Sequence, residues 1–182
     1  MTTAATPLTP LQPASGQPTL AVRDLRTRFT TRTGSVMAVD GVSFEVGRGR
    51  ILGLVGESGS GKSVTGFSIL GLIDPPGAVV GGSVWFEGRD LTRLSERELR
   101  ALRGNRIAMI FQDPMMTLNP VLSIETQMVE TVLAHERVSH QAARARAIEV
   151  LSRVGIASAA ERLQQYPHQF SGGMRQRVAI AI

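Results

Sequence analysis

The sequence predicts an α/β fold built on a strand, a loop and a helix in direct succession. Residues 51–55 form an apolar run with no polar face, as expected of a parallel strand buried on both sides. A glycine-rich loop follows, and over residues 62–72 the apolar side chains of Val64, Phe67 and Leu70 keep helical spacing. With 182 residues, of which 42% are apolar, the chain is long enough for one domain with a substantial core.

The segment before this unit predicts a tail and two strands. Residues 1–18 are rich in Thr, Pro and Ala and carry no charge, so we expect a disordered tail. Residues 20–29 and 36–46 mix β-branched, apolar and polar residues at strand-like spacing, and a Thr-Gly-Ser turn at 33–35 separates them.

Further short elements follow the predicted helix, which a Pro-Pro-Gly run at residues 75–77 is expected to end. Residues 82–86 predict a strand, and the apolar run 107–111 predicts a second buried strand. Between them, Ser95 and Glu98 have the spacing of a capping box, which predicts a short helix.

The remainder of the chain is expected to be mostly helical. Residues 141–154 carry one apolar stripe, followed by Gly155 as a C-terminal cap. The stripe consists of Ala147, Val150, Leu151 and Val154. Residues 166–173 are expected to form a loop, with a helix beginning at Arg175.

Composition excludes several classes of site and partner. The chain has no cysteine, which excludes a disulfide scaffold, a thiolate metal site and a cysteine nucleophile. The net charge of +5 could indicate nucleic acid or an anionic membrane, or only a general preference for arginine. No basic block occurs and the aromatic share is 4%, so we expect no nucleic-acid partner. No run approaches the ~18–20 apolar residues that span a bilayer, and the proline-rich N-terminus does not resemble a signal peptide, so a membrane role would require a partner.

The loop between the predicted strand and helix matches the pattern G-x-x-x-x-G-K-[ST]. Its residues are Gly56, Glu57, Ser58, Gly59, Ser60, Gly61, Lys62 and Ser63. Glycines let the backbone curl so that several N–H groups point at one anion, and the helix N-terminus adds a favourable dipole. We expect Lys62 to reach the β- and γ-phosphates of ATP, and the Ser63 hydroxyl to ligate Mg²⁺.

The alternative is a glycine-rich turn that precedes Gly-Lys-Ser by chance. Lys62 is the only lysine in a chain whose other basic residues are all arginines. This position therefore requires an ammonium group rather than a guanidinium fork, which favours the phosphate-binding interpretation.

A second motif, Phe-Ser-Gly-Gly-Met-Arg-Gln-Arg at residues 170–177, resembles the signature of the ABC ATPase family. Phe and Met stand where Leu and Gln are usual. Ser-Gly-Gly before a helix is itself an anion-binding helix start, although an ordinary loop is the alternative. The resemblance implies that Ser171, Gly172 and Gly173 contact the γ-phosphate of ATP bound by the other subunit.

Two further residues match the family by position. Gln112 follows the predicted strand 107–111 and resembles the glutamine of the Q-loop, which implies a role in positioning Mg²⁺ and the attacking water. Phe29 resembles the aromatic residue that stacks on adenine, and a core position is the alternative.

Three longer strings narrow the resemblance to the dipeptide, oligopeptide and nickel importers, and to the first of their two ATPase subunits. They are GLVGESGSGKS, GNRIAMIFQDPMMTLNP and YPHQFSGGMRQRVAIA. The resemblance implies a P-loop NTPase core with an N-terminal antiparallel β subdomain. It also implies one nucleotide-binding domain over residues 19–182, with a helical subdomain at about 113–170.

The same resemblance implies a location and partners. The chain would be the ATP-binding subunit of an importer of peptides or nickel, at the cytoplasmic face of the inner membrane. Its partners would be a second ATPase subunit in a heterodimer, two membrane permease subunits and, indirectly, an extracytoplasmic solute-binding protein.

In the family, an apolar strand ending in Asp-Glu and a switch histidine follow the signature, and the 182 residues contain neither. We therefore expect a chain truncated relative to the family, which binds ATP without competent hydrolysis. The alternatives are a soluble ABC-type ATPase acting on nucleic acid or ribosomes, a binding module that pairs with intact subunits, and a non-functional fragment.

Overall fold

The computed structural model describes residues 16–113 and 117–182, which fall into two compact units. The first unit ends at Arg103, and the second runs from Gly104 to Ile182. The predicted tail, residues 1–18, lies mostly outside the described residues, and residues 16–18 form neither helix nor strand.

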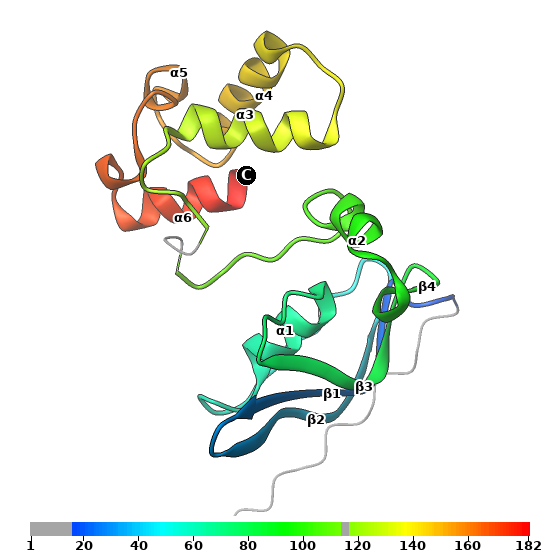
Figure 1. The fold of residues 1–182 in the computed structure, drawn as a ribbon. Helices are drawn as coiled ribbons and strands as arrows, with labels where there is room; N and C mark the ends of the chain where they lie inside the picture. The colour runs from blue at the N-terminus through cyan, green and yellow to red at the C-terminus, as the bar shows by residue number, and fades with distance from the viewer. Residues whose placement is uncertain (1–15, 114–116) are drawn as a thin grey trace, which may run out of the picture. The chain divides into compact units, whose positions relative to one another are not determined.

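The first unit is built on an antiparallel sheet of four strands in the order β2-β1-β3-β4 (Figure 1). The strands are β1 (Leu20–Thr31), β2 (Gly34–Val46), β3 (Gly77–Phe86) and β4 (Arg89–Asp90). β1 and β2 form a hairpin closed by Thr31 opposite Gly34. The two predicted N-terminal strands are confirmed, although β1 continues to Thr31 and β2 already begins at Gly34, within the predicted turn. Strand β3 begins at Gly77 rather than at residue 82.

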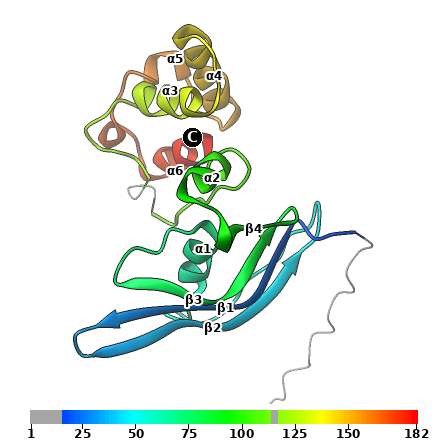
Figure 2. The same cartoon turned by 45° about the vertical axis from the view of Figure 1, so that its right-hand side comes forward.

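Helix α1 (Lys62–Leu70) contacts β1 and β2 of this sheet (Figure 2). Thr27 of β1 and Ser68 of α1 are both buried, and their hydroxyl oxygens lie 2.6 Å apart. The helix ends at Gly71, whose φ of 63° is left-handed, so the stop comes before the predicted Pro-Pro-Gly run.

A 3₁₀ turn, η1 (Leu91–Arg93), and helix α2 (Glu96–Leu102) complete the unit. The predicted capping box is confirmed, because the Glu98 N–H donates to Ser95 Oγ at 3.4 Å and the Ser95 N–H donates to Glu98 Oε2 at 2.9 Å. The Ser95 hydroxyl also donates to Glu98 Oε2, at 2.8 Å, and this bond and the one from the Ser95 N–H hold the pKa of the Glu98 carboxyl below its usual range.

The prediction of two buried parallel strands is wrong for this structure. Residues 51–55 and 107–111 are not strands, and Ile51 and Val55 are 100% and 90% exposed. Ile110 is 56% exposed. A strand needs a neighbour to pair its backbone groups, and among the described residues all strand pairs are antiparallel and involve only β1 to β4. Apolar composition alone therefore did not make these segments strands.

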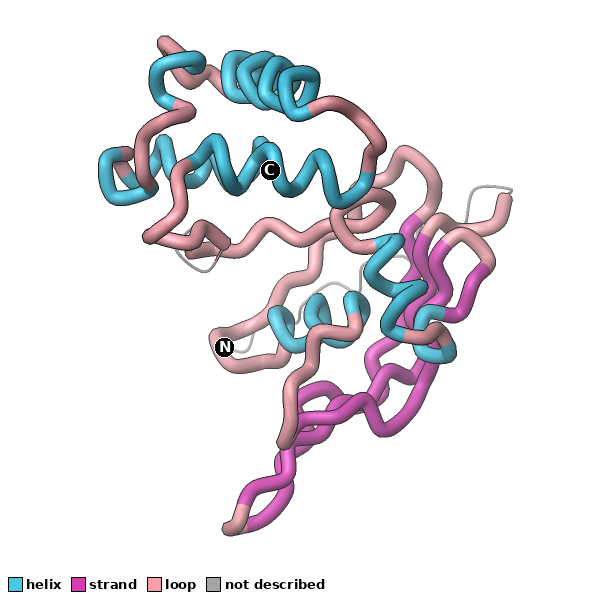
Figure 3. The backbone as a smooth tube through the Cα atoms, turned by 45° about the horizontal axis from the view of Figure 1, so that its top comes forward, coloured by secondary structure: helices cyan, strands magenta, loops and turns pink. Residues whose placement is uncertain are grey.

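The second unit is helical (Figure 3). Its elements are α3 (Ile124–His135), α4 (His140–Arg153), α5 (Ala159–Arg162), the 3₁₀ turn η3 (Pro167–Gln169) and α6 (Gly172–Ala181). Ser123, Ser139 and Ser171 cap the N-termini of α3, α4 and α6 with their hydroxyl groups. One apolar cluster joins these helices, and it includes Leu118, Ile124, Met128, Ala147, Leu151, Ile156, Leu163, Phe170 and Val178.

The helix predicted at 141–154 is confirmed as α4, although its buried face differs in part. Ala147 and Leu151 are buried as expected, and Val150 and Val154 are only partly buried. The predicted loop 166–173 contains η3, and α6 begins at Gly172 rather than at Arg175. Across residues 16–113 and 117–182, no helix has the length and hydropathy needed to cross a membrane.

Candidate functional site

The predicted phosphate-binding loop leads directly into α1, with Gly61 as the residue that precedes the helix. Gly59 and Gly61 have left-handed φ angles of 82° and 87°, which favour glycine strongly. A Cβ on Gly61 would also collide with the carbonyl oxygen of Ala38 on β2. The loop is therefore curled and held close to the sheet, and only glycine fits at position 61.

The N-terminus of α1 has no side-chain cap. The first N–H groups of a helix have no acceptor within the helix, so here they are available to an anion. Thr65 stabilises the first turn of α1, because its N–H and its Oγ1 both donate to the Gly61 carbonyl, at 2.8 and 2.9 Å. Ser63, in the first turn, is exposed.

Lys62 brings its ammonium group into the curve of the loop. Its Nζ donates to the carbonyl oxygens of Gly56 and Glu57, at 2.8 and 2.6 Å, and lies 3.3 Å from Ser60 Oγ. A positive charge and a helix N-terminus therefore meet at one exposed loop, an arrangement suited to a polyphosphate.

The signature residues form the start of α6. Ser171 accepts a hydrogen bond from the Met174 N–H at 3.3 Å, and Phe170 before it is buried in the core of the second unit. A Cβ on Gly172 or Gly173 would meet no atom within 4 Å. Packing among the described residues therefore does not require glycine at either position, and the backbone at this helix start is open to approach from outside.

Gln112 and Phe29 lie in different surroundings. Gln112 is exposed in a bend of the second unit. Phe29 is half-buried on β1 between Val36 and Gly77, and its ring lies close against Gly77 beside Ile73. These contacts make Phe29 a packing residue of the sheet, and adenine stacking by Phe29 and Mg²⁺ positioning by Gln112 stay predictions.

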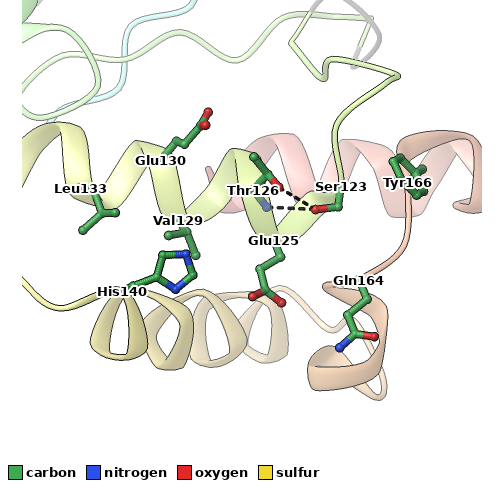
Figure 4. Close-up of a pocket in the computed structure, with 9 residues that line it drawn as sticks. All are labelled: Ser123, Glu125, Thr126, Val129, Glu130, Leu133, His140, Gln164 and Tyr166. Carbon is green, nitrogen blue, oxygen red and sulfur yellow. Dashed lines mark hydrogen bonds between the residues drawn. The ribbon is translucent and has the colours of Figure 1, made fainter.

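The second unit contains a cavity of about 580 Å³ that the sequence did not indicate. Figure 4 shows its lining by α3, the start of α4 and the segment before η3. Polar groups that line the cavity already have partners within the unit. Glu125 of α3 accepts from Arg144 of α4 at 3.2 Å, and Ser123 caps α3. In the described part of the chain, no three His, Asp or Glu side chains converge as a metal site would require.

Sequence reasoning also missed Arg103, which binds the C-terminal end of α1. Its Nε donates to the Leu70 carbonyl at 2.7 Å and its Nη2 to the Gly71 carbonyl at 2.8 Å. The partners are more than thirty residues apart in the chain, so no local pattern could have indicated the contact.

Comparison with protein-family models gives a match to the family described as ABC transporter over residues 39–182. The matched region contains the phosphate-binding loop and the helix start at Ser171. The chain belongs to the ABC transporter family.

Relatives within this family are transport ATP-binding proteins. The dipeptide transport ATP-binding protein DppD of Bacillus subtilis is 52% identical over 90% of this chain and 49% of its own length. The oligopeptide transport ATP-binding protein OppD of the same organism is 51% identical over 90% of this chain and 46% of its own length. The chain spans about half the length of the curated relatives it matches.

Solved ABC transporter cassettes share the fold. The dimeric cassette MJ0796 matches with a TM-score of 0.77 and 26% identity, over 89% of this chain and 67% of the cassette. A second structure of MJ0796, in a post-hydrolysis state with ADP and Pi, matches equally well. The ABC ATPase fold predicted from the two motifs is therefore confirmed.

Proposed function

We propose that this chain is the ATP-binding part of an ABC importer for peptides or nickel, acting at the cytoplasmic face of the cell membrane. The observation that carries the proposal is the phosphate-binding loop, where Lys62 lies inside the curve and α1 presents an uncapped N-terminus. The identity of about 50% with peptide transport ATP-binding proteins supports the substrate class.

Each site residue has a proposed role in nucleotide binding. Lys62 would contact the β- and γ-phosphates, and backbone N–H groups of the loop and of the first turn of α1 would donate to phosphate oxygens. Ser63 and Gln112 ligate or position Mg²⁺, which supplies charge neutralisation at the phosphates when it is bound. Phe29 is proposed to approach the adenine.

The helix start at Ser171, Gly172 and Gly173 is proposed to contact nucleotide held by a second ATPase subunit. The dimeric arrangement of the MJ0796 cassette supports pairing of this kind. Two membrane permease subunits and a solute-binding protein would complete the importer, as the resemblance to peptide importers implies.

The 182 residues contain no apolar strand ending in Asp-Glu and no histidine after the signature. We propose that they bind Mg·ATP without steady-state hydrolysis, because they do not contain the Asp-Glu pair that, by resemblance to the family, would orient the attacking water. Release of inorganic phosphate by the purified chain at the rate of an intact cassette would contradict this part of the proposal.

Equilibrium titration with Mg·ATP tests the nucleotide-binding role. We expect saturable binding by the chain and loss of binding, by at least about a hundredfold in Kd, when Lys62→Ala removes a charge that contacts the phosphates. The matched control is Arg93→Ala, which removes a basic side chain that is 85% exposed and outside the loop. Equal affinity in Lys62→Ala and in the unmodified chain would exclude the proposed site.

A further inference from the structure

Helix α1 has no residue of its own that would compensate its dipole at either end. Its first turn contains no acidic residue and its last turn no basic residue. The last carbonyl groups of a helix have no partner within the helix and carry partial negative charge, so the compensating group has to come from elsewhere in the fold.

Arg103, the residue that ends α2, supplies this compensation with two nitrogens of its guanidinium, and its third nitrogen binds Glu96. Nε and Nη2 donate to the carbonyls of Leu70 and Gly71, at 2.7 and 2.8 Å, and Nη1 donates to Glu96 Oε1 at 2.7 Å. Hydrogen bonding to Arg103 is also the main cause that keeps the pKa of Glu96 below its usual range. A lysine has one nitrogen and cannot reproduce this fork.

The surroundings leave Arg103 little freedom to move. Its side chain is 20% exposed, and a Cβ on Gly71 would lie 3.1 Å from its Nη2 and 3.2 Å from Leu99 Cδ1. Glycine at position 71 therefore permits the close approach. The capping box of Ser95 and Glu98 fixes the start of α2, and so the direction from which Arg103 reaches α1.

Contacts that fix the C-terminal end of α1 also affect the position of its N-terminal end, because the helix is short. Nine residues make a helix of about 13 Å, too short to be stable alone, so its position depends on tertiary contacts. We propose that Arg103 is a positioning residue for nucleotide binding: it holds the C-terminal end of α1 and thereby fixes the N-terminal turn and Lys62 against the phosphates. This inference rests on the proposed binding of ATP by the loop.

The experiment compares Mg·ATP affinity and thermal stability in matched variants of the full chain. Arg103→Gln is expected to raise Kd about tenfold, the effect typical of residues that support ligand-binding groups from behind. Arg100→Gln is the control, because Arg100 also lies 3.3 Å from Glu96 Oε1 but has no described hydrogen bond to α1. Its Kd is expected to stay unchanged.

The Val22→Ala variant tests whether a general loss of stability is enough to weaken Mg·ATP binding. It removes buried volume from β1, in the same unit. We expect this variant to lower the melting temperature and leave Kd unchanged, with all titrations performed well below the melting temperatures. Arg103→Lys, which retains the charge and can keep one hydrogen bond, is expected to give an intermediate Kd.

Three outcomes would overturn the inference. Unchanged Kd in folded Arg103→Gln would assign Arg103 a purely structural role, as would a Kd change in Val22→Ala equal to that in Arg103→Gln. If Arg103→Gln does not fold, an unchanged Kd in Arg103→Lys would likewise assign Arg103 a purely structural role. Absence of Mg·ATP binding by the unmodified chain would instead reject the proposed function itself, and this inference with it.

Discussion

The hydroxyl oxygens of Thr27 and Ser68 lie 2.6 Å apart in the interior of the first unit and join the sheet to the helix that follows the phosphate-binding loop. Ser68 Oγ donates to the Val64 carbonyl at 2.7 Å, so the proton between the two hydroxyls belongs to Thr27. This polar contact and the Arg103 bonds together hold the C-terminal half of α1.

Thr27→Val is expected to destabilise the first unit by about 1 kcal/mol, because it removes a buried donor and leaves a lone pair of Ser68 unpaired at nearly constant volume. Urea unfolding, monitored by the fluorescence of Trp85, measures the effect in this unit, because Trp85 is the only tryptophan of the chain and lies in β3. Thr27→Ser keeps the hydroxyl and serves as the control. Unchanged stability of Thr27→Val would show that the hydrogen bond between Thr27 and Ser68 does not stabilise this unit.

Gly61→Ala and Gly59→Ala are expected to weaken Mg·ATP binding to different extents, although both glycines have left-handed φ angles. At position 59 the added Cβ meets no atom within 4 Å, so the cost is backbone strain of about 1–2 kcal/mol. At position 61 the Cβ would also collide with the Ala38 carbonyl, which forces the loop away from the sheet. Mg·ATP titration should therefore give a larger rise in Kd for Gly61→Ala, and the reverse order would contradict the loop geometry.

The capping box predicts an acid-dependent loss of stability. Because the folded-state pKa of Glu98 is lowered, its contribution is fully present above the unfolded-state pKa of about 4.3 and disappears as the pH falls through the lower folded-state value. The Glu98→Gln variant keeps a side chain that can accept from Ser95 but does not titrate. Melting temperatures measured between neutral pH and pH ~3 should show the advantage of the unmodified chain over this variant shrinking on acidification. A difference that stays constant with pH would reject this assignment.

Gly172→Ala and Gly173→Ala should weaken contact with a partner subunit without lowering the stability of the chain. Alanine fits both positions without a clash and stabilises a helix by about 0.5–1 kcal/mol relative to glycine. We expect unchanged or higher stability and unchanged Mg·ATP affinity, but weaker ATP-dependent pairing with a partner ATPase subunit in sedimentation velocity. Undiminished pairing would argue against a role of this helix start in nucleotide contact between subunits.

Local signals in the sequence predicted local structure well. The spacing of Ser95 and Glu98 predicted a capping box that the structure contains. The glycine-rich pattern predicted a curled loop, and in the structure Gly59 and Gly61 have left-handed angles. These features depend on a few consecutive residues and on steric rules that act within them.

Features that depend on distant partners were predicted poorly. Residues 51–55 and 107–111 have strand-like composition, yet a strand forms only where a neighbouring strand pairs its backbone. Among the described residues no strand pairs with either segment, and Ile107 forms only an isolated bridge. The contact of Arg103 with Leu70 is absent from any local pattern for the same reason. The loop was therefore predictable from sequence, whereas the anchors that hold its helix were not.

Hydrogen exchange of the backbone amides with and without Mg·ATP is the most direct test of the central claim, that residues 56–63 bind phosphate through their backbone and Lys62. Binding should slow exchange chiefly at the loop and the first turn of α1, and Lys62→Ala should abolish the change. Slowed exchange confined to other regions, such as the α3 and α4 segments that line the cavity of the second unit, would contradict the account.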